Sequence, residues 1–235
     1  MNYHKKFEKF GYLSNFKAIN ASSASKIFLN FQKNLNKNNQ KLIRNEIIYN
    51  PHLVFSSFYN LIENKKILKI VKTILGEKIV LWNSLIFYKK KKNFVSFHQD
   101  LKYWKFKNSN CLTVSLALTD SNLNNGCLHV VPKSHKNVFN HEKKFRDKYN
   151  LLGGNQFVNL KPNKAIPIIL SPGQFSIHHG NIVHGSFPNN LEKPRALYAM
   201  RFAKYNNPSK IYFYANYMYR RKNEKKYFEE LPSCK

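Results

Sequence analysis

Residues 94–104 place an imidazole and a carboxylate two positions apart in an otherwise apolar, aromatic run. In an extended strand, side chains alternate between the two faces, so His98 and Asp100 would project from one face while Gln99 points away. A single metal ion can then contact both side chains. A surface histidine beside an aspartate in a turn is the alternative, and these two residues alone do not decide between the two interpretations.

A second group of candidate residues lies in 171–188, where three histidines fall within seven residues. His178 and His179 fit polar positions of a half-buried strand, so we interpret them as structural. His184 is different, because a neutral imidazole from a late strand would complete a two-histidine, one-carboxylate ligand set for iron(II). Arg195 follows His184 by eleven positions, at the start of the next predicted strand.

The region after Gly76 has the period-two pattern of strands. We predict strands at 79–88, 94–100, 112–118, 127–131, 156–160, 166–170, 174–179, 182–187 and 195–203. Short strands at this spacing, without helical crossovers, favour an antiparallel double-sheet barrel or jelly roll over a βαβ fold. We expect the polar segment 137–155 to pass over the mouth of this barrel, and 211–219 to form a last strand or helix.

Two structural helices are predicted ahead of the strands. The first would follow a group of serines that are candidate N-caps, Ser22, Ser23 and Ser25. Its apolar residues recur at helical spacing: Ile27, Phe28, Phe31 and Leu35. The second helix should cover 61–75 and end at Gly76.

The chain has 235 residues, of which 43% are hydrophobic, so it suits one folded domain. We divide this single domain, 1–235, into a mostly helical support (1–76), a jelly-roll core (77–205) and a basic tail (206–235). No apolar stretch suits a membrane span or a signal segment, so we expect a cytoplasmic protein without a membrane partner. The three cysteines have no paired spacing, so they indicate neither disulfides nor a zinc site.

The formal charge of +28 would suit a polyanionic partner. The excess is lysine rather than arginine, and it is scattered apart from local runs such as 89–92 and 220–222. This pattern favours a solvated surface, so we do not expect nucleic acid as a partner.

At this point the sequence resembles the phytanoyl-CoA dioxygenase-like branch of the iron(II)- and 2-oxoglutarate-dependent oxygenases. The likeness covers about residues 5–205 and is carried by 10–12, 81–84, 97–104, 117–120, 125–135, 172–174 and the spacing from His184 to Arg195. It implies a mainly β fold, a double-stranded β-helix (jelly roll, cupin-like) barrel with N-terminal flanking helices. One departure is Lys133, where the family usually has glycine before Ser-His; this affects a turn and not the metal.

The resemblance implies roles for six residues of this sequence. His98, Asp100 and His184 would be the catalytic iron ligands. Arg195 would bind the distal carboxylate of 2-oxoglutarate, since its planar fork matches a carboxylate. Lys89 and Ser186 would lie near the same co-substrate. Tyr103, Trp104 and segment 137–155 are candidate walls of the substrate pocket.

The implied activity is hydroxylation of an aliphatic carbon of a small metabolite, using iron(II), 2-oxoglutarate and O₂ and releasing succinate and CO₂. Relatives act on acyl thioesters, amino acids, osmolytes and phosphonates, and no residue selects among these; a basic pocket would favour an anionic metabolite. Because relatives that halogenate have a small residue in place of Asp100, we expect hydroxylation. Two alternatives stay open: a non-catalytic cupin-like binding domain, and an oxygenase of the same chemistry that acts on nucleic acid.

Overall fold

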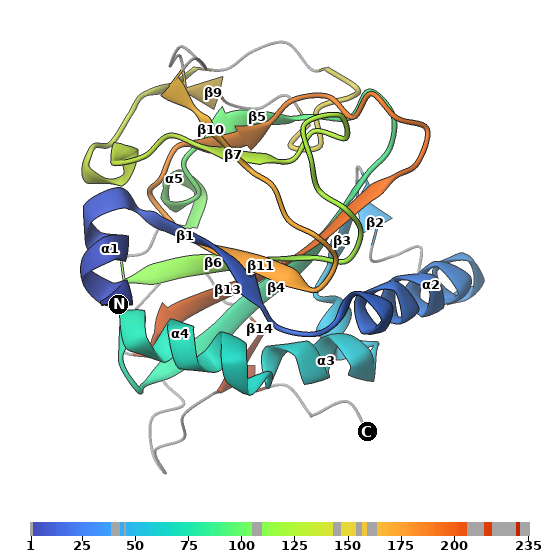
Figure 1. Ribbon diagram of the computed structural model, residues 1–235, viewed down its shortest axis with the longest axis horizontal. Coiled ribbons are helices and arrows are strands. Elements are labelled where there is room, and N and C mark those ends of the chain that lie inside the picture. The colour runs from blue at the N-terminus through green and yellow to red at the C-terminus, as the bar shows by residue number, and fades with distance from the viewer. Residues whose placement is uncertain are drawn as a thin grey trace.

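The computed structural model describes residues 2–38, 43–44, 46–104, 110–142, 147–153, 157–158, 164–205, 214–217 and 229–230. Figure 1 shows a large sheet in the middle of the molecule and a smaller sheet facing it. The helices α3 and α4 cover the face of the large sheet that is turned away from the small one. The predicted mainly β class is confirmed, and the two facing sheets agree with the predicted jelly roll.

The large sheet has the order β1-β11-β6-β13-β4-β14-β15, with β3 paired to β4 and β2 paired to β3. Its strands are β1 (Tyr12–Lys17), β2 (Ile43–Arg44), β3 (Ile47–Tyr49), β4 (Ile79–Lys89), β6 (Cys111–Ala117), β11 (Gln174–His179), β13 (Arg195–Lys204), β14 (Tyr214–Tyr217) and β15 (Glu229–Glu230). All of its pairs are antiparallel except β14 with β15.

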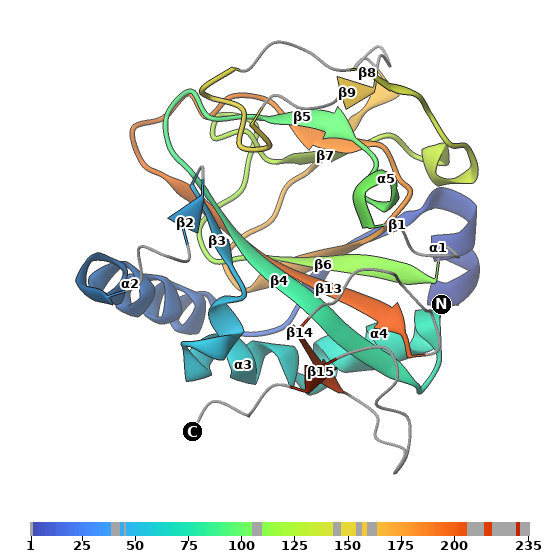
Figure 2. The same cartoon turned by 180° about the vertical axis from the view of Figure 1, so that it is seen from behind.

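The small sheet has the order β10-β7-β12-β5 and is antiparallel throughout. Its strands are β5 (Val95–His98), β7 (Leu128–Val130), β10 (Ile166–Ile168) and β12 (His184–Ser186). A hairpin of β8 (His141–Glu142) and β9 (Phe157–Val158) lies in and after the predicted excursion 137–155. Figure 2 shows the hairpin beside the small sheet, at the end of the molecule away from α3 and α4.

The helices are α1 (Tyr3–Phe10), α2 (Ala21–Asn38), α3 (Ser56–Ile62), α4 (Lys65–Leu75) and α5 (Leu101–Trp104), with 3₁₀ turns η2 (Pro51–Leu53) and η3 (Ser134–Lys136). Two expectations are corrected. The predicted helix 61–75 is broken, because the Asn64 side chain accepts hydrogen bonds from the backbone N–H groups of Lys66 and Ile67 and so starts a new helix, α4. The cap of α2 is Asn20, whose side chain accepts from the N–H of Ser23, and not one of the serines.

The alternation of side chains along β13 separates two environments. Tyr198, Met200 and Phe202 point into the main hydrophobic core, together with residues of α3 and α4. The intervening residues of the strand line a pocket between the two sheets: Arg195, Leu197, Ala199 and Arg201. Because side chains alternate along a strand, one face of β13 contributes to the hydrophobic core and the other face lines the polar pocket.

The three predicted parts of the chain are not separate in the sheets. Strands β1, β2 and β3, from the part predicted to be helical support, join the large sheet. Most of 206–235 lies outside the described residues, and the division at 76 and 205 stays a prediction. In the described part of the chain, no helix combines the length and apolar character that a membrane crossing needs. The cytoplasmic location also stays a prediction.

Candidate metal centre

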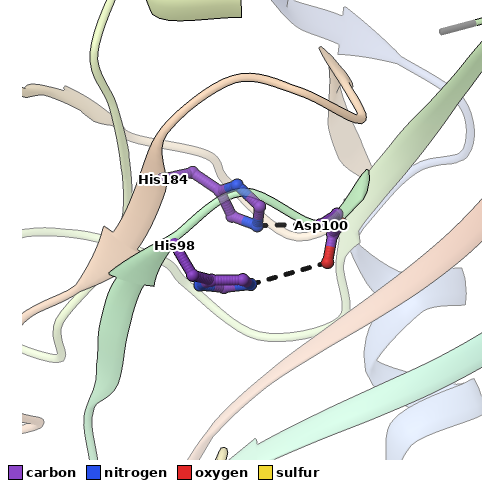
Figure 3. A group of neighbouring side chains, drawn as sticks. All are labelled: His98, Asp100 and His184. Carbon is purple, nitrogen blue, oxygen red and sulfur yellow. Dashed lines mark ion pairs between the residues drawn. The ribbon is translucent and has the colours of Figure 1, made fainter. Parts of the chain in front are cut away.

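Three side chains converge between the sheets: His98, Asp100 and His184. Their nearest ligand atoms all lie within 4.8 Å of one another, and all three residues are buried. The Nε2 atoms of His98 and His184 lie 3.5 and 3.8 Å from the two carboxylate oxygens of Asp100 (Figure 3). Such a group of two imidazoles and one carboxylate is the facial ligand set of non-heme iron(II) sites.

The two histidines come from paired strands, but the aspartate does not. His98 ends β5 and is the direct partner of His184 at the start of β12. Asp100 lies after the strand, in the turn into α5, where its carbonyl accepts from the Tyr103 N–H at 2.9 Å. The expectation that one continuous strand presents His98 and Asp100 is therefore wrong, although the two side chains do meet.

Gln99, between them, holds this turn in place. Its Nε2 donates to the carbonyls of Asn137 and Asn181, and its Oε1 accepts from the N–H of Phe139. The side chain is buried and tied to neighbouring loops instead of facing the metal ligands. Its predicted direction agrees with these contacts.

Both imidazoles have a fixed tautomer. Nδ1 of His98 lies 2.8 Å from the carbonyl of Ser96, and Nδ1 of His184 lies 3.0 Å from the carbonyl of Ile182. A carbonyl oxygen only accepts, so each Nδ1 carries the proton and each Nε2 offers its lone pair toward Asp100. Backbone carbonyls that orient histidine ligands in this way are typical of metal sites, so the donor set fits a divalent cation.

The ionisation of the cluster also suits a cation. Burial alone would raise the pKa of Asp100, but the charge of Arg201 and, after it, the interactions with His98 and His184 bring it well below its usual value. Burial lowers the pKa of His184 far below that of free histidine. The carboxylate is therefore charged and His184 neutral, which are the states that bind metal.

A buried pair of cationic side chains lies in the same region. Arg195 and Lys89 are direct partners across β13 and β4, and Nζ of Lys89 donates to Oγ of Ser186 at 2.8 Å. Arg195 was expected on a strand next to His184; it lies instead on the opposite sheet and faces the same pocket. The structure thus brings all six predicted site residues together, although their roles stay predictions.

Two donor atoms of the Arg195 guanidinium have no partner among the described residues. These atoms, Nε and Nη1, are both buried. Burial lowers the pKa of Arg195 to about 10, and it lowers that of Lys89 to about 6, with repulsion from Arg195 as the second cause. Leaving a buried guanidinium unpaired is costly, so these residues fit a bound carboxylate such as that of 2-oxoglutarate.

The pocket between the sheets has an empty volume of about 490 Å³. A wider space of about 1220 Å³ adjoins this pocket, and the two share Phe87, His98, Asp100 and Arg201. The candidate walls Tyr103 and Trp104 do line this wider space, as does Leu151 of segment 137–155. Residues 143–146 and 154–155 of that segment lie outside the described residues.

Two residues of the site were not identified from the sequence. Arg201 forms an ion pair with Asp100, at 3.3 Å between Nη2 and Oδ1. It lies six residues beyond Arg195 on one strand, so the period of two was a signal that could have placed both on one face. His178 was interpreted as structural and half-buried, but it is buried beside His184, with 4.6 Å between ring centres, and lines the pocket.

Comparisons with known proteins agree with this geometry. The profile of the phytanoyl-CoA dioxygenase (PhyH) family matches residues 3–197. A probable alpha-ketoglutarate-dependent hypophosphite dioxygenase of Stutzerimonas stutzeri is 30% identical over 176 residues, which are 73% of this chain and 60% of that relative. This chain therefore aligns with well under the full length of that relative.

Solved structures share the fold. The apo form of the non-heme monooxygenase ThoJ aligns with a TM-score of 0.84 and 20% identity, over 98% of this chain and 88% of ThoJ. EctD from S. alaskensis, with 2-oxoglutarate and 5-hydroxyectoine, aligns with a TM-score of 0.71 and 18% identity, over 88% of this chain and 77% of EctD. At these identities, the likeness is evidence of a common fold.

Proposed function

Because this chain belongs to the phytanoyl-CoA dioxygenase family, we propose that it is an iron(II)- and 2-oxoglutarate-dependent oxygenase. The proposed reaction hydroxylates an aliphatic carbon of a small molecule. One observation carries the proposal: a buried cluster of two histidines and one aspartate shares a pocket with Arg195, whose buried guanidinium has unsatisfied donors among the described residues. A cation and a carboxylate are the two ligands that such a pocket accepts.

Iron(II) held by His98, Asp100 and His184 would, with 2-oxoglutarate and O₂, supply the oxidising power to put one oxygen atom into a C–H bond. The chain's own residues do the rest of the work. Arg195 would bind and orient the distal carboxylate of the co-substrate through its planar fork. Val95, Leu128 and Leu197 line the pocket with apolar surface and exclude water from it.

Lys89 and Ser186 support the end of the pocket near Arg195. Nζ of Lys89 donates to Oγ of Ser186 and to the carbonyls of Gly126 and Phe187. Gly126 has φ +65°, and a Cβ there would overlap Nζ of Lys89 and the carbonyl of Phe187. We propose that this arrangement places the ammonium group and the Ser186 hydroxyl beside the co-substrate carboxylate.

Neither alternative has comparable support. A non-catalytic domain would not need His98, Asp100 and His184 together with Arg195 in one pocket. An oxygenase acting on nucleic acid would need cations around the mouth of the wider space, and Arg201 is the one lysine or arginine among the described residues that line it. In the nearby lysine run, Lys90 pairs with Glu46 and Lys91 with Glu192 at exposed positions, which points to a solvated surface.

The test is succinate formation from 2-oxoglutarate by the purified, iron-loaded protein, with a panel of small organic molecules as substrates. We expect turnover that needs both iron(II) and 2-oxoglutarate and that rises with a subset of the panel. His129→Ala is the matched control for His184→Ala, because His129 is also buried, with its Nδ1 against a carbonyl, but lies outside the cluster. Absence of iron-dependent succinate formation would reject the proposal.

A further inference from the structure

Arg201 lines the wider space beside the metal cluster, where it forms an ion pair with Asp100. The two arginines lie six residues apart on β13, which is roughly 20 Å along an extended strand. Arg201 is shared by both spaces, whereas Arg195 lines the smaller one alone. If 2-oxoglutarate pairs with Arg195, then Arg201 is left to face the molecule that is oxidised.

The guanidinium of Arg201 is held firmly. Its central carbon lies 4.8 Å from the ring centre of Trp104 and 5.6 Å from that of Trp82. Nη1 donates to Oδ1 of Asn83 at 3.2 Å, and Nη2 to Oδ1 of Asp100 at 3.3 Å. These contacts fix the plane of the fork but use two of its five N–H donors.

The charge balance leaves this guanidinium without full compensation. This inference rests on the proposed function, in which the pocket binds a divalent cation and the 2-oxoglutarate dianion. The charges of these two ligands cancel each other. Asp100 then compensates one of the two arginines, so one positive charge remains, and a second is present when the neighbouring Lys89 is protonated. Among the described residues that line the wider space, Asp100 is the one acidic group. A positively charged, aromatic-walled site of this kind selects an anion.

We propose that Arg201 binds the acidic group of the primary substrate, and that this substrate is a small organic acid bearing a carboxylate or a phosphonate. The oxyanion pairs with the free N–H donors of the fork. The hydrocarbon part lies against the apolar side chains of the wider space, Ile47, Leu85, Leu151 and Leu152. In the reaction, one C–H bond becomes C–OH; one atom of O₂ enters the product and the other enters succinate as 2-oxoglutarate loses CO₂.

Binding to the full-length protein tests this assignment. The protein is loaded with zinc(II), which does not support turnover, and saturated with 2-oxoglutarate so that Arg195 is occupied. Tryptophan fluorescence reports binding, because Trp82 and Trp104 pack against Arg201. The probes are butyrate, butylphosphonate and the neutral control butyramide. We expect at least one acid to bind about tenfold more tightly than the amide. The tighter acid identifies the substrate as a carboxylate or a phosphonate.

Variants of Arg201 distinguish between two roles of this residue: direct binding of the substrate, and support of the Asp100 carboxylate alone. Arg201→Gln should remove the preference for acid over amide, whereas a supporting role alone would weaken acid and amide binding equally. Arg201→Lys should keep part of the preference. Lys204→Gln removes the same charge from an exposed position on the same strand and should bind all probes like the native protein.

The proposal is overturned if acids and amide bind alike, if neither acid shows saturable binding, or if Arg201→Gln keeps the preference. Failure of the proposed function looks different, because it would abolish iron-dependent succinate formation whatever the binding ratio in the zinc-loaded protein.

Discussion

Lys89 and Arg195 lie directly opposite each other on β4 and β13, and both basic side chains are buried. Like charges placed this way destabilise each other, and burial adds a desolvation cost to both. Of the described residues lining the pocket beside them, the one acidic group is Asp100, which lies with the metal cluster. This juxtaposition is explained by an anionic ligand that binds between them, and it leads to the first two predictions.

Replacing Arg195 by Ala should raise the concentration of 2-oxoglutarate needed for half-maximal binding by about 10- to 150-fold, the range expected for one charge-assisted hydrogen bond. Metal affinity should change little, because the ion pairs of Asp100 are with His98, His184 and Arg201 and not with Arg195. Titration calorimetry with 2-oxoglutarate and with manganese(II) measures the two effects separately. Lys193→Ala, an exposed lysine two residues away, is the control. An unchanged 2-oxoglutarate requirement would move the anchor to Lys89.

Binding of 2-oxoglutarate should take up a proton through Lys89. The pKa of this amine falls from 10.5 to about 6 on burial beside Arg195, so it is largely neutral at pH 7.5 without ligand. An anion favours the charged form and raises the pKa, so affinity should increase as pH falls from 8 toward the ligand-free pKa and level off below it. Calorimetry in buffers of different ionisation enthalpy measures the uptake. Lys89→Met should abolish it, and equal uptake in that variant would assign the proton to another group.

Lys133 is the position where the resemblance led us to expect glycine, and its backbone has φ +67°. A residue other than glycine is strained by roughly 1 kcal/mol or more in this left-handed region. Glycine removes this strain, but its greater conformational freedom also stabilises the unfolded chain and so offsets part of the gain. Lys133→Gly should therefore raise the free energy of unfolding by up to about 1 kcal/mol. Lys136→Gly, in η3, should have no stabilising effect. Thermal unfolding of the two variants checks this, and a lower melting temperature for Lys133→Gly would contradict it.

The core chemistry was accessible from sequence because it depends on residue types at short spacing. His98 and Asp100 were selected by their short spacing and His184 by its place in a late strand, whereas the role of Arg195 was implied by the family resemblance; these roles stay predictions. Strand β11 was predicted with its observed bounds. Details that depend on non-local contacts were not. The predicted helix 61–75 breaks at Asn64 because the side chain of this residue caps α4, and this capping outweighs the helix propensity of the surrounding residues. Asp100 lies outside the strand because the chain turns into α5 at this point. The place of Arg201 in the site was not predicted because its contacts come from two distant segments, Trp82 of β4 and residues 100–104.

The product should contain one added oxygen atom and no halogen. If Asp100 binds the iron as we propose, it takes the position that a halide would need, and Arg201 holds its carboxylate in place. Turnover in isotopically labelled O₂ with chloride present, followed by mass spectrometry, distinguishes the outcomes once a substrate has been found. A chlorinated product from the native protein would refute the role assigned to Asp100.

The central claim is that one pocket binds iron(II) through His98, Asp100 and His184 and 2-oxoglutarate through Arg195. The most direct measurement is an anaerobic titration of the iron(II)-loaded protein with 2-oxoglutarate, followed by visible absorption, because a 2-oxo acid chelated to iron(II) gives a charge-transfer band. We predict a saturable band in the native protein and in His129→Ala, a band that needs more 2-oxoglutarate in Arg195→Ala, and none in His184→Ala. Absence of the band in the native protein, or an undiminished band in a folded His184→Ala variant, would contradict the account.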